Sequence, residues 1–255
     1  MAIKKDIQIQ FGNNADAYVN SDLHKKGEDL KKIIDLTQLQ GTETVLDVAT
    51  GGGHTALALA PFAKNVVALD LTEQMLLKAE AYALECGHEN ISFICGDAEN
   101  MPFPDEQFDL VTCRIAAHHF PKISLFLQES YRVLKKGGTL ILDDNVAPEN
   151  DELDFYYNEI EKKRDYSHHR AWKKSEWIHM IEHKGFRIEE LCSFPKYFQF
   201  ESWCSRMQLS MKEKQELNDY MCAATSHIKE YLEIKTDNIL VQSFRGEAVI
   251  LTANK

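Results

Sequence analysis

Apolar runs and segments of helical periodicity alternate along this chain up to about residue 145. Short apolar runs at Asn65–Leu69, Ile91–Cys95 and Phe108–Cys113 predict buried strands. Between them, Leu71–Leu84 and Ile123–Leu134 show the three- and four-residue apolar spacing of helices that face a core. Strands and helices in this order predict an α/β fold with a parallel sheet and helices on both faces.

Beyond about residue 145 the alternation changes. Asp151–Arg164 and Lys174–His183 predict helices, Phe186–Phe194 predicts a strand, and Glu201–Glu233 is helical with mixed polarity. Glu247–Thr252 predicts a closing strand. A chain of 255 residues, 44% of them hydrophobic, is long enough to bury a full core as one domain.

A glycine-rich turn follows the first predicted strand, within Val45–Gly53. Gly51, Gly53 and Ala56 match the G-x-G-x-x-[G/A] fingerprint of a dinucleotide site, so a nicotinamide oxidoreductase is one interpretation. Asp47 argues against it, because a carboxylate beside the turn repels a pyrophosphate. The same carboxylate attracts the ammonium and sulfonium groups of S-adenosylmethionine (SAM), which we therefore expect as the ligand. A helix-capping Asp in a turn without ligand is the structural alternative.

Acidic residues also end the second and third predicted strands. Asp70 follows Asn65–Leu69, where a carboxylate can accept hydrogen bonds from both ribose hydroxyls of a nucleoside, and Leu71 and Met75 can cover the adenine. Asp97 follows the third strand and can accept from the adenine amino group. Helix capping by Asp70 and a plain turn at Asp97 are the alternatives. Three acidic residues at three successive strand ends favour one shared nucleoside site.

Several ordered motifs resemble the class I SAM-dependent methyltransferases, close to the ubiquinone/menaquinone-biosynthesis family with its methyltransferase type 11 domain. The matching segments are Val45–Gly53, Val67–Met75, Gly96–Pro104, Phe108–Val111 and Arg132–Leu140, and Phe11–Tyr18 resembles the amino-terminal cofactor flap of these enzymes. Thr50 departs from the pattern, since many relatives carry Gly or Cys there.

The resemblance implies a seven-stranded, mostly parallel, Rossmann-like sheet with helices on both faces. Its last strands form a hairpin, and a helical insertion covers the substrate side. It implies a single domain over residues 1–255, with a cofactor-binding core at about 40–145 and an amino-terminal flap at about 8–39. Acceptor-side helices are expected at about 150–184 and 201–233.

The resemblance also implies that SAM is the cofactor and S-adenosylhomocysteine (SAH) the product. By this resemblance, the methionine end of SAM lies at the glycine turn, its ribose at Asp70 and its adenine at Asp97. The cofactor-binding residues that it implies are Phe11, Tyr18, Asp47, Ala49, Gly51, Gly53, Asp70, Leu71, Met75, Asp97, Ala98 and Arg114.

The methyl acceptor is expected beyond the carboxyl ends of the fourth and fifth strands, where open α/β sheets bind their ligands. His119 is our first candidate for a general base and His118 the second, because neutral imidazole accepts protons near neutral pH. The alternative is that these histidines cap the next helix or pack in the core.

A second group of candidates lies in Arg164–Arg170, which resembles an Arg-Asp-x-Ser-His-x-Arg segment of a bacterial subgroup. Arg164, His168 and Arg170 are candidates for contact with an anionic or hydroxylated acceptor. A polar turn between helices, with Asp165 or Ser167 capping the next helix, explains the segment equally well.

Composition narrows the class of partner. The net charge of −11 and the scattered basic residues argue against nucleic acid, so we expect a small-molecule substrate. No apolar run spans a bilayer, no signal-peptide core follows Met1, and six scattered cysteines suggest neither metal nor disulfides, so we expect a cytoplasmic protein without metal. A homodimer is left open.

Together these features predict a SAM-dependent methyltransferase that acts on a small, cyclic or aromatic acceptor by O- or C-methylation. A methyltransferase-like module that binds SAM without turnover is the main alternative. An NAD-dependent oxidoreductase is the second alternative.

Overall fold

An eight-stranded mixed sheet organises the molecule in the computed structural model, which describes residues 2–19 and 27–255, with side chains for 4–12 and 27–255. The strand order is β3-β2-β1-β4-β5-β8-β6, with β7 paired to β8. The strands are β1 (Thr44–Val48), β2 (Asn65–Asp70), β3 (Ile91–Cys95), β4 (Phe108–Arg114), β5 (Leu134–Val146), β6 (Arg187–Gln199), β7 (Lys235–Asp237) and β8 (Leu240–Asn254).

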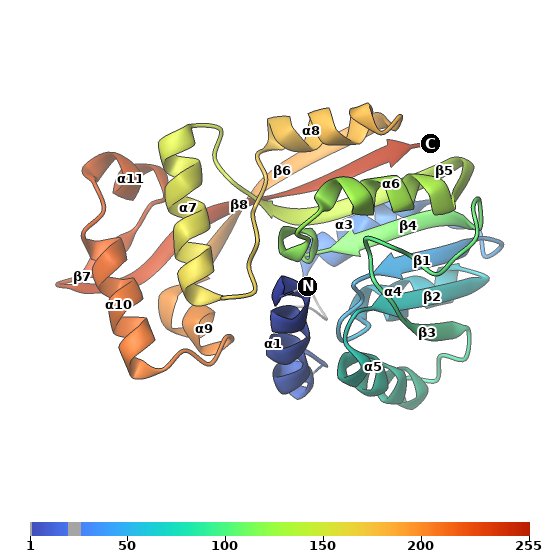
Figure 1. Ribbon diagram of the computed structural model, residues 1–255, viewed down its shortest axis with the longest axis horizontal. Helices are drawn as coiled ribbons and strands as arrows, with labels where there is room; N and C mark the ends of the chain where they lie inside the picture. Colours follow the sequence, from blue (N-terminus) through green and yellow to red (C-terminus); the bar gives the residue numbers. More distant parts are fainter. Residues whose placement is uncertain (1, 20–26) are drawn as a thin grey trace.

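The first five strands are parallel, and β8 is antiparallel to both β5 and β6 (Figure 1). This confirms the predicted α/β fold and its closing hairpin. The number of strands differs from the prediction of seven, because β7, a three-residue strand, pairs with the amino-terminal part of β8. β6 and β8 are also longer than predicted, since they continue past the core into a helical extension.

Helices cover both faces of the sheet. α3 and α4 pack on one face through Ile33, Ala56 and Leu59, and α6 and α8 pack on the other through Phe126 and Trp177. The helices are α1 (Ala2–Val19), α3 (Glu28–Thr37), α4 (His54–Leu59), η1 (Ala60–Phe62), α5 (Glu73–Glu85), η2 (Ala117–His119), α6 (Ile123–Val133), α7 (Asp151–Arg164) and α8 (Lys174–His183). The predicted bounds of α7 and α8 are confirmed.

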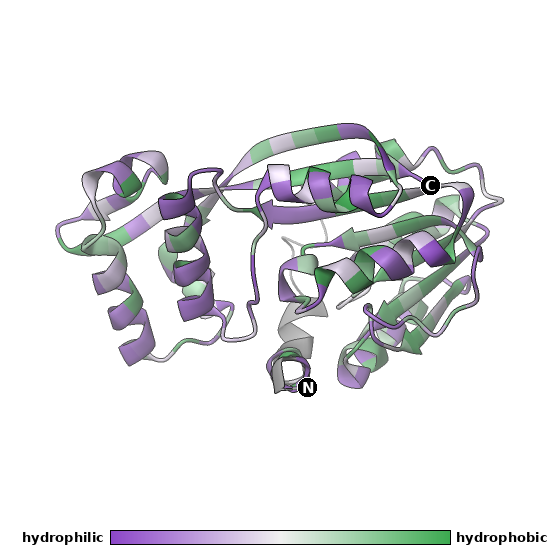
Figure 2. Ribbon diagram, turned by 45° about the horizontal axis from the view of Figure 1, so that its top comes forward, coloured by the Kyte–Doolittle hydropathy of each residue, from purple (hydrophilic) through white to green (hydrophobic). Residues whose placement is uncertain are grey.

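The helical extension joins α7 to α9 (Phe200–Ser205), α10 (Met211–Cys222) and α11 (Ser226–Tyr231) around its own apolar cluster. The single helical stretch predicted over 201–233 is therefore wrong in detail. Gln208 adopts φ 56°, and Ser210 and Glu213 form a capping box, which ends one helix and begins the next. In Figure 2 the strands are largely hydrophobic, whereas α7 and α10 are largely hydrophilic.

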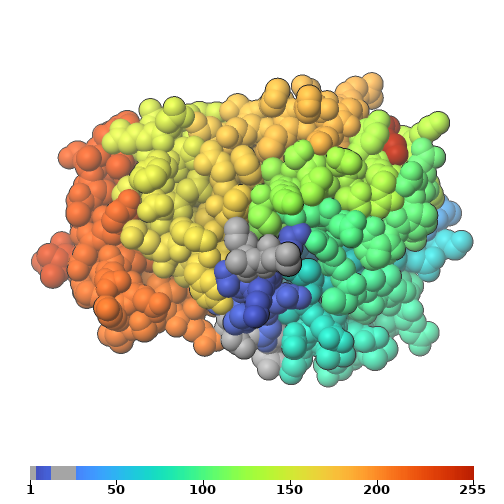
Figure 3. Space-filling view, viewed as in Figure 1, coloured from blue at the N-terminus to red at the C-terminus, as the bar shows by residue number. Residues whose placement is uncertain are grey.

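α1 lies between these two parts of the molecule, against the carboxyl-end edge of the parallel strands. In the space-filling view it occupies the middle of the face, flanked by the extension on one side and by α5 on the other (Figure 3). Tyr166, just after α7, donates a hydrogen bond to the carbonyl of Asp6, and Gln8 donates to the carbonyl of Leu71 after β2. α1 therefore contacts both parts.

Candidate functional site: two adjoining cavities

The glycine turn is shaped by backbone conformations that suit glycine. Gly51 has φ 54° and Gly53 has φ 80°, in the left-handed region where a side chain is strained. A Cβ at Gly53 would lie 3.0 Å from Leu57 Cδ1 and 3.1 Å from Ala79 Cβ. Gly53 therefore lets α4 pack closely on α5, while Gly51 and Gly52 line the cavity beyond.

Asp47 lies in β1, one residue before the strand ends, and is buried. Its carboxylate accepts hydrogen bonds from Thr50 Oγ1 at 2.6 Å and Thr112 Oγ1 at 2.8 Å. Burial raises its pKa to about 6, although the two hydroxyls oppose the shift. Thr50, the departure from the family pattern, thus holds the carboxylate that faces the cavity.

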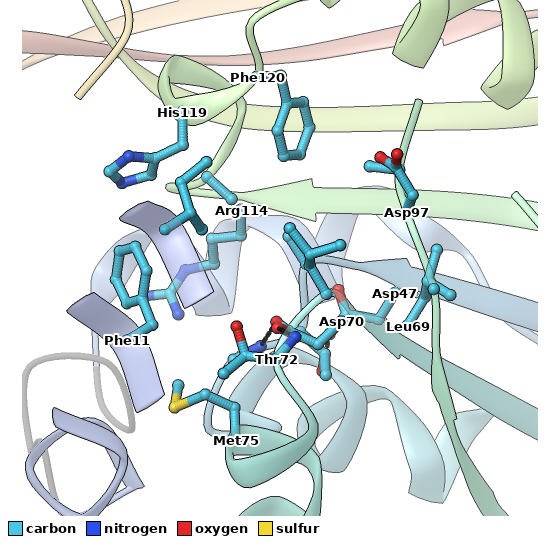
Figure 4. Close-up of a pocket in the computed structure, with 18 of the residues that line it drawn as sticks. Phe11, Asp47, Leu69, Asp70, Thr72, Met75, Asp97, Arg114, His119 and Phe120 are labelled. Carbon is cyan, nitrogen blue, oxygen red and sulfur yellow. Dashed lines mark hydrogen bonds between the residues drawn. The ribbon is translucent and has the colours of Figure 1, made fainter. Parts of the chain in front are cut away.

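Asp70 ends β2 and holds the glycine turn in place. Gly51 N donates to its Oδ2 at 2.9 Å and Thr72 N donates to its Oδ1 at 2.8 Å (Figure 4). Burial raises the pKa of this carboxyl against those hydrogen bonds. Each carboxylate oxygen has a second lone pair, so Asp70 can position the turn and still accept from a ligand hydroxyl. A local structural role for Asp70, like the helix capping considered above, is thus compatible with a role in binding a nucleoside.

Asp97 receives a contact from α1. Lys4 Nζ lies 2.6 Å from Asp97 Oδ2 and 2.5 Å from Glu99 Oε2, and Glu99 N donates to Asp97 Oδ1 at 2.9 Å. Asp97 therefore already pairs with a cation where an adenine amino group is expected. Sequence reasoning missed Lys4, because the predicted flap begins only near residue 8.

These residues surround a first cavity, which has a volume of about 120 Å³. Of the twelve expected cofactor residues, those that line it are Phe11, Asp47, Ala49, Gly51, Asp70, Leu71, Met75, Asp97, Ala98 and Arg114. Gly53 lies behind the turn, and the side chain of Tyr18 lies outside the described residues. Sequence reasoning missed Ile7, His54 and Ile115, which also line this cavity.

Arg114 ends β4 at the floor of the first cavity. Its guanidinium pairs with Asp29 of α3, with Nη2 at 2.6 Å from Oδ2, and its Nε lies 3.6 Å from Asp143 Oδ2. Arg114 holds the pKa of Asp29 below its usual range, against burial, whereas burial raises the pKa of Asp143 well above its own. Asp29 and Asp143 thus shift in opposite directions although both lie within ion-pair distance of the same guanidinium.

A second cavity, with a volume of about 80 Å³, adjoins the first. The two share the lining residues Phe11, Ile115 and His119. The remaining lining residues are His118, Asn145, Glu161, Arg164, Asp165, Lys196, Trp203, Arg206 and Met207. Ile115 has φ 52°, a left-handed conformation that is strained for a β-branched residue. A strained residue therefore lies where the two cavities meet.

His118 is held by Asp144 of β5. His118 Nδ1 lies 2.5 Å from Asp144 Oδ1, and its backbone N donates to Oδ2 at 2.8 Å. Burial alone would lower the pKa of His118, but the charge and hydrogen bond of Asp144 outweigh it and raise the pKa. Since Nδ1–H is directed at the carboxylate, Nε2 is the nitrogen left to exchange protons with a ligand.

His119 lies beside His118, with ring centroids 4.2 Å apart, and contacts Phe11 of α1 edge-on at 5.0 Å (Figure 4). Its Nδ1 is 3.1 Å from the carbonyl of Ser167, and its Nε2 is 4.0 Å from Asp165 Oδ2. Burial and the neighbouring charge of His118 lower the pKa of His119 to about 4. His119 is therefore neutral at physiological pH.

The Arg164–Arg170 segment is only partly at the site. Arg164 lines the second cavity, paired with Glu161 at 2.9 Å. His168 and Arg170 line neither cavity: His168 Nε2 contacts Asn158 Oδ1 at 3.0 Å, and Arg170 pairs with Asp154 and Glu176. Lys196 and Arg206 were missed, because nothing local in β6 or after α9 signals a binding residue.

Comparison with known proteins agrees with this geometry. A methyltransferase domain model matches residues 46–142. The uncharacterized methyltransferase YcgJ of Bacillus subtilis is 38% identical over 199 residues, which cover 78% of this chain and 79% of YcgJ. The crystal structure of a candidate methyltransferase from Bacillus halodurans C-125 has a TM-score of 0.88 at 54% identity, covering 90% of this chain and 99% of that one. The chain belongs to the SAM-dependent methyltransferases.

This methyltransferase also resembles the ubiquinone/menaquinone biosynthesis C-methyltransferase UbiE of Rickettsia bellii, with 33% identity over 162 residues that cover 57% of the chain and 63% of UbiE. The predicted family and the cofactor SAM are thereby confirmed, and the dinucleotide interpretation is withdrawn. No helix within residues 2–19 and 27–255 is long and apolar enough to cross a membrane. Over the same residues, no cluster of His, Cys, Asp and Glu suited to a metal ion is present.

Proposed function

We propose that this methyltransferase transfers the methyl group of SAM, bound in the first cavity, to a small-molecule acceptor bound in the second. The observation that carries this proposal is that the two cavities adjoin and share Phe11, Ile115 and His119. A donor in one and an acceptor in the other would meet beside His119. Alignment of two reactants in this way can lower a barrier by roughly 7–11 kcal/mol.

The donor set of the first cavity fits SAM. Carboxylates at Asp47, Asp70 and Asp97 offer acceptors for cationic groups, ribose hydroxyls and an amino group, and the glycine turn permits close approach. When bound, SAM supplies a methyl carbon that its sulfonium already activates. What remains for the protein is to orient the acceptor, exclude water and take up a proton.

Proton uptake is assigned to the two histidines at the boundary. An acceptor hydroxyl or acidic C–H would give its proton to an imidazole Nε2 as the acceptor atom bonds the methyl carbon and the carbon–sulfur bond breaks. His118 has a carboxylate partner that stabilises the imidazolium, whereas His119 is closer to the first cavity and neutral. Both remain candidates for the base, and O- and C-methylation both fit this arrangement.

Ligand titration followed by product analysis tests this function. Calorimetry should show binding of SAM and SAH but not of NAD. Incubation with SAM and a panel of small phenols, enols and carboxylic acids should give a methylated product by mass spectrometry, together with SAH. Binding of NAD in preference to SAM, or SAM binding without turnover of any small molecule while a macromolecular acceptor is methylated, would contradict the proposal.

A further inference from the structure

Three cationic side chains line the second cavity, from three separate elements. Arg164 ends α7, Lys196 lies in β6 and Arg206 follows α9. Arg164 is already matched by a carboxylate, because Glu161 Oε2 accepts from its Nη2 at 2.9 Å. Its guanidinium also lies over the ring of Trp203, 5.0 Å from the centroid. The Arg164 charge is thus compensated within the protein.

Lys196 is in a different situation. Its Nζ donates to Asn145 Oδ1 at 3.0 Å and lies 6.0 Å from the ring centroid of Phe198, and neither partner is charged. Among the described residues, no carboxylate lies within ion-pair distance of this ammonium. An ammonium has three donors, and one is used here. A half-buried lysine therefore faces the cavity with its charge unmatched by contact.

The other charged groups around the cavity do not supply the missing anion. Asp144 is bound by His118, and Oδ1 of Asp165 accepts from Ser167 N and Oγ while its Oδ2 faces His119. Asp143 and Asp29 also interact electrostatically with Lys196, but both carboxyls lie within ion-pair distance of Arg114 instead.

We propose that the methyl acceptor carries an anionic group, a carboxylate or a phosphate, that Lys196 binds at the β6 wall of the second cavity. The atom to be methylated then points away from β6, toward His118 and His119. This inference rests on the proposed function, since it names the class of acceptor for the same site. Lysine suits the role as a compact point charge that does not demand a planar, bidentate partner.

Three matched probes test this proposal on protein saturated with SAH. They share a phenol ring and differ in the group opposite the hydroxyl: 4-hydroxybenzoate, 4-hydroxyphenyl phosphate and the neutral 4-hydroxybenzamide. Calorimetry should show that at least one anion binds roughly tenfold or more tightly than the amide, since contact with an unmatched, half-buried charge is worth a charged hydrogen bond. The preferred anion tells carboxylate from phosphate.

Variants then locate the effect. Lys196→Met should reduce the preference for the anion to within about twofold, whereas Lys196→Arg should keep most of it, because the charge remains. Lys64→Met, at an exposed lysine remote from both cavities, is the matched control and should leave the preference unchanged. Equal affinity for all three probes, or no binding of any of them, overturns the proposal. A preference for the anion that survives in Lys196→Met overturns it as well.

Failure of the proposed function would look different. SAH binding is measured first, on the same protein, and its absence would contradict the methyltransferase assignment of the first cavity. Normal SAH binding without discrimination among the probes would contradict the role of Lys196 alone.

Discussion

The two cavities meet at Ile115, yet they differ in charge and in construction. The first is lined by the carboxylates of Asp47, Asp70 and Asp97 and by the main chain of a glycine turn. The second is lined by imidazole, guanidinium and ammonium groups, with the carboxylates of Glu161 and Asp165 and aromatic and thioether side chains among them. Under the proposed function, the cationic methyl donor binds on the acidic side and the acceptor on the side that is richer in imidazole and cationic groups.

Construction differs as well. Most of the first cavity comes from loops that follow β1, β2, β3 and β4, at one edge of a parallel sheet. The second draws on η2 and β5 of the parallel core and on α1, α7, β6 and the segment after α9, which approach from outside that core. The shape of the first cavity is therefore determined mainly by the loops at one edge of the parallel sheet. The acceptor side depends on how the helical extension and α1 pack against that edge.

The largest effect is expected from His118→Asn. If His118 takes the proton of the acceptor, turnover should fall by roughly 10²–10⁴, while SAM affinity should stay within about twofold, because His118 lines only the second cavity. Single-turnover measurements with an acceptor from the panel, together with calorimetry for SAM, check both parts. His119→Asn is the paired comparison: a larger loss there than in His118→Asn would assign the base to His119.

The next effect concerns the first cavity alone. Asp70→Asn removes a charged acceptor that holds Gly51 N and Thr72 N, so SAM affinity should fall roughly 10- to 100-fold. Calorimetry with SAM and SAH measures it, and circular dichroism confirms that the variant is folded. Unchanged affinity in a folded variant would remove Asp70 from the nucleoside site.

The pH dependence of binding should also separate the two sides. Because the pKa of Asp47 is raised to about 6 in the folded protein, its carboxylate is ionised above pH 6 and progressively protonated below it. SAM affinity should therefore decrease by up to about tenfold per pH unit below 6, since the cationic ligand loses an opposite charge. Calorimetry between pH 5 and 8 checks this, and Asp47→Asn should flatten the profile.

The same shift has a stability counterpart of opposite sign. A carboxyl whose pKa is higher in the folded state binds more protons there than in the unfolded chain, so the free energy of unfolding of the ligand-free protein should rise as the pH falls from about 6 toward 4. Denaturant titrations of wild type and Asp47→Asn isolate this contribution from other buried acids. An identical pH slope in both proteins would contradict it.

The smallest effect is expected from Arg170→Gln. Arg170 pairs with Asp154 of α7 and Glu176 of α8 and lines neither cavity. Turnover and SAM affinity should both stay within about twofold, and the loss of stability should be about 1 kcal/mol or less, as for other partly exposed ion pairs. A large loss of turnover would mean that the acceptor reaches beyond the second cavity.

Sequence reasoning reached the first cavity because its determinants are local. Asp47, Asp70 and Asp97 each follow an apolar run, and parallel strands bring their carboxyl ends to one edge. Spacing along the chain was therefore enough to predict these three carboxylates, and the resemblance to the class I methyltransferases implied the rest of the ten expected residues that line this cavity. Lys4 escaped because it approaches on a separate helix, through an ion pair that no sequence pattern encodes.

The second cavity was predicted in part, at residues that include His118, His119 and Arg164. Lys196 lies on a strand whose surface alternates in burial, and neither it nor Arg206 differs in sequence context from a solvated basic residue. Their placement depends on the length of β6 and on the break between α9 and α10. Such tertiary packing cannot be read from periodicity.

Ile115 has a consequence for how the passage between the cavities is maintained. Its left-handed backbone would suit glycine or asparagine, and keeping isoleucine there costs of order 1–3 kcal/mol. The Ile115 amide donates to the Asp143 carbonyl at 2.7 Å, so pairing with β5 holds the residue in this conformation. Part of the boundary between the two cavities is thus shaped by a fixed backbone conformation and not only by side-chain rotamers.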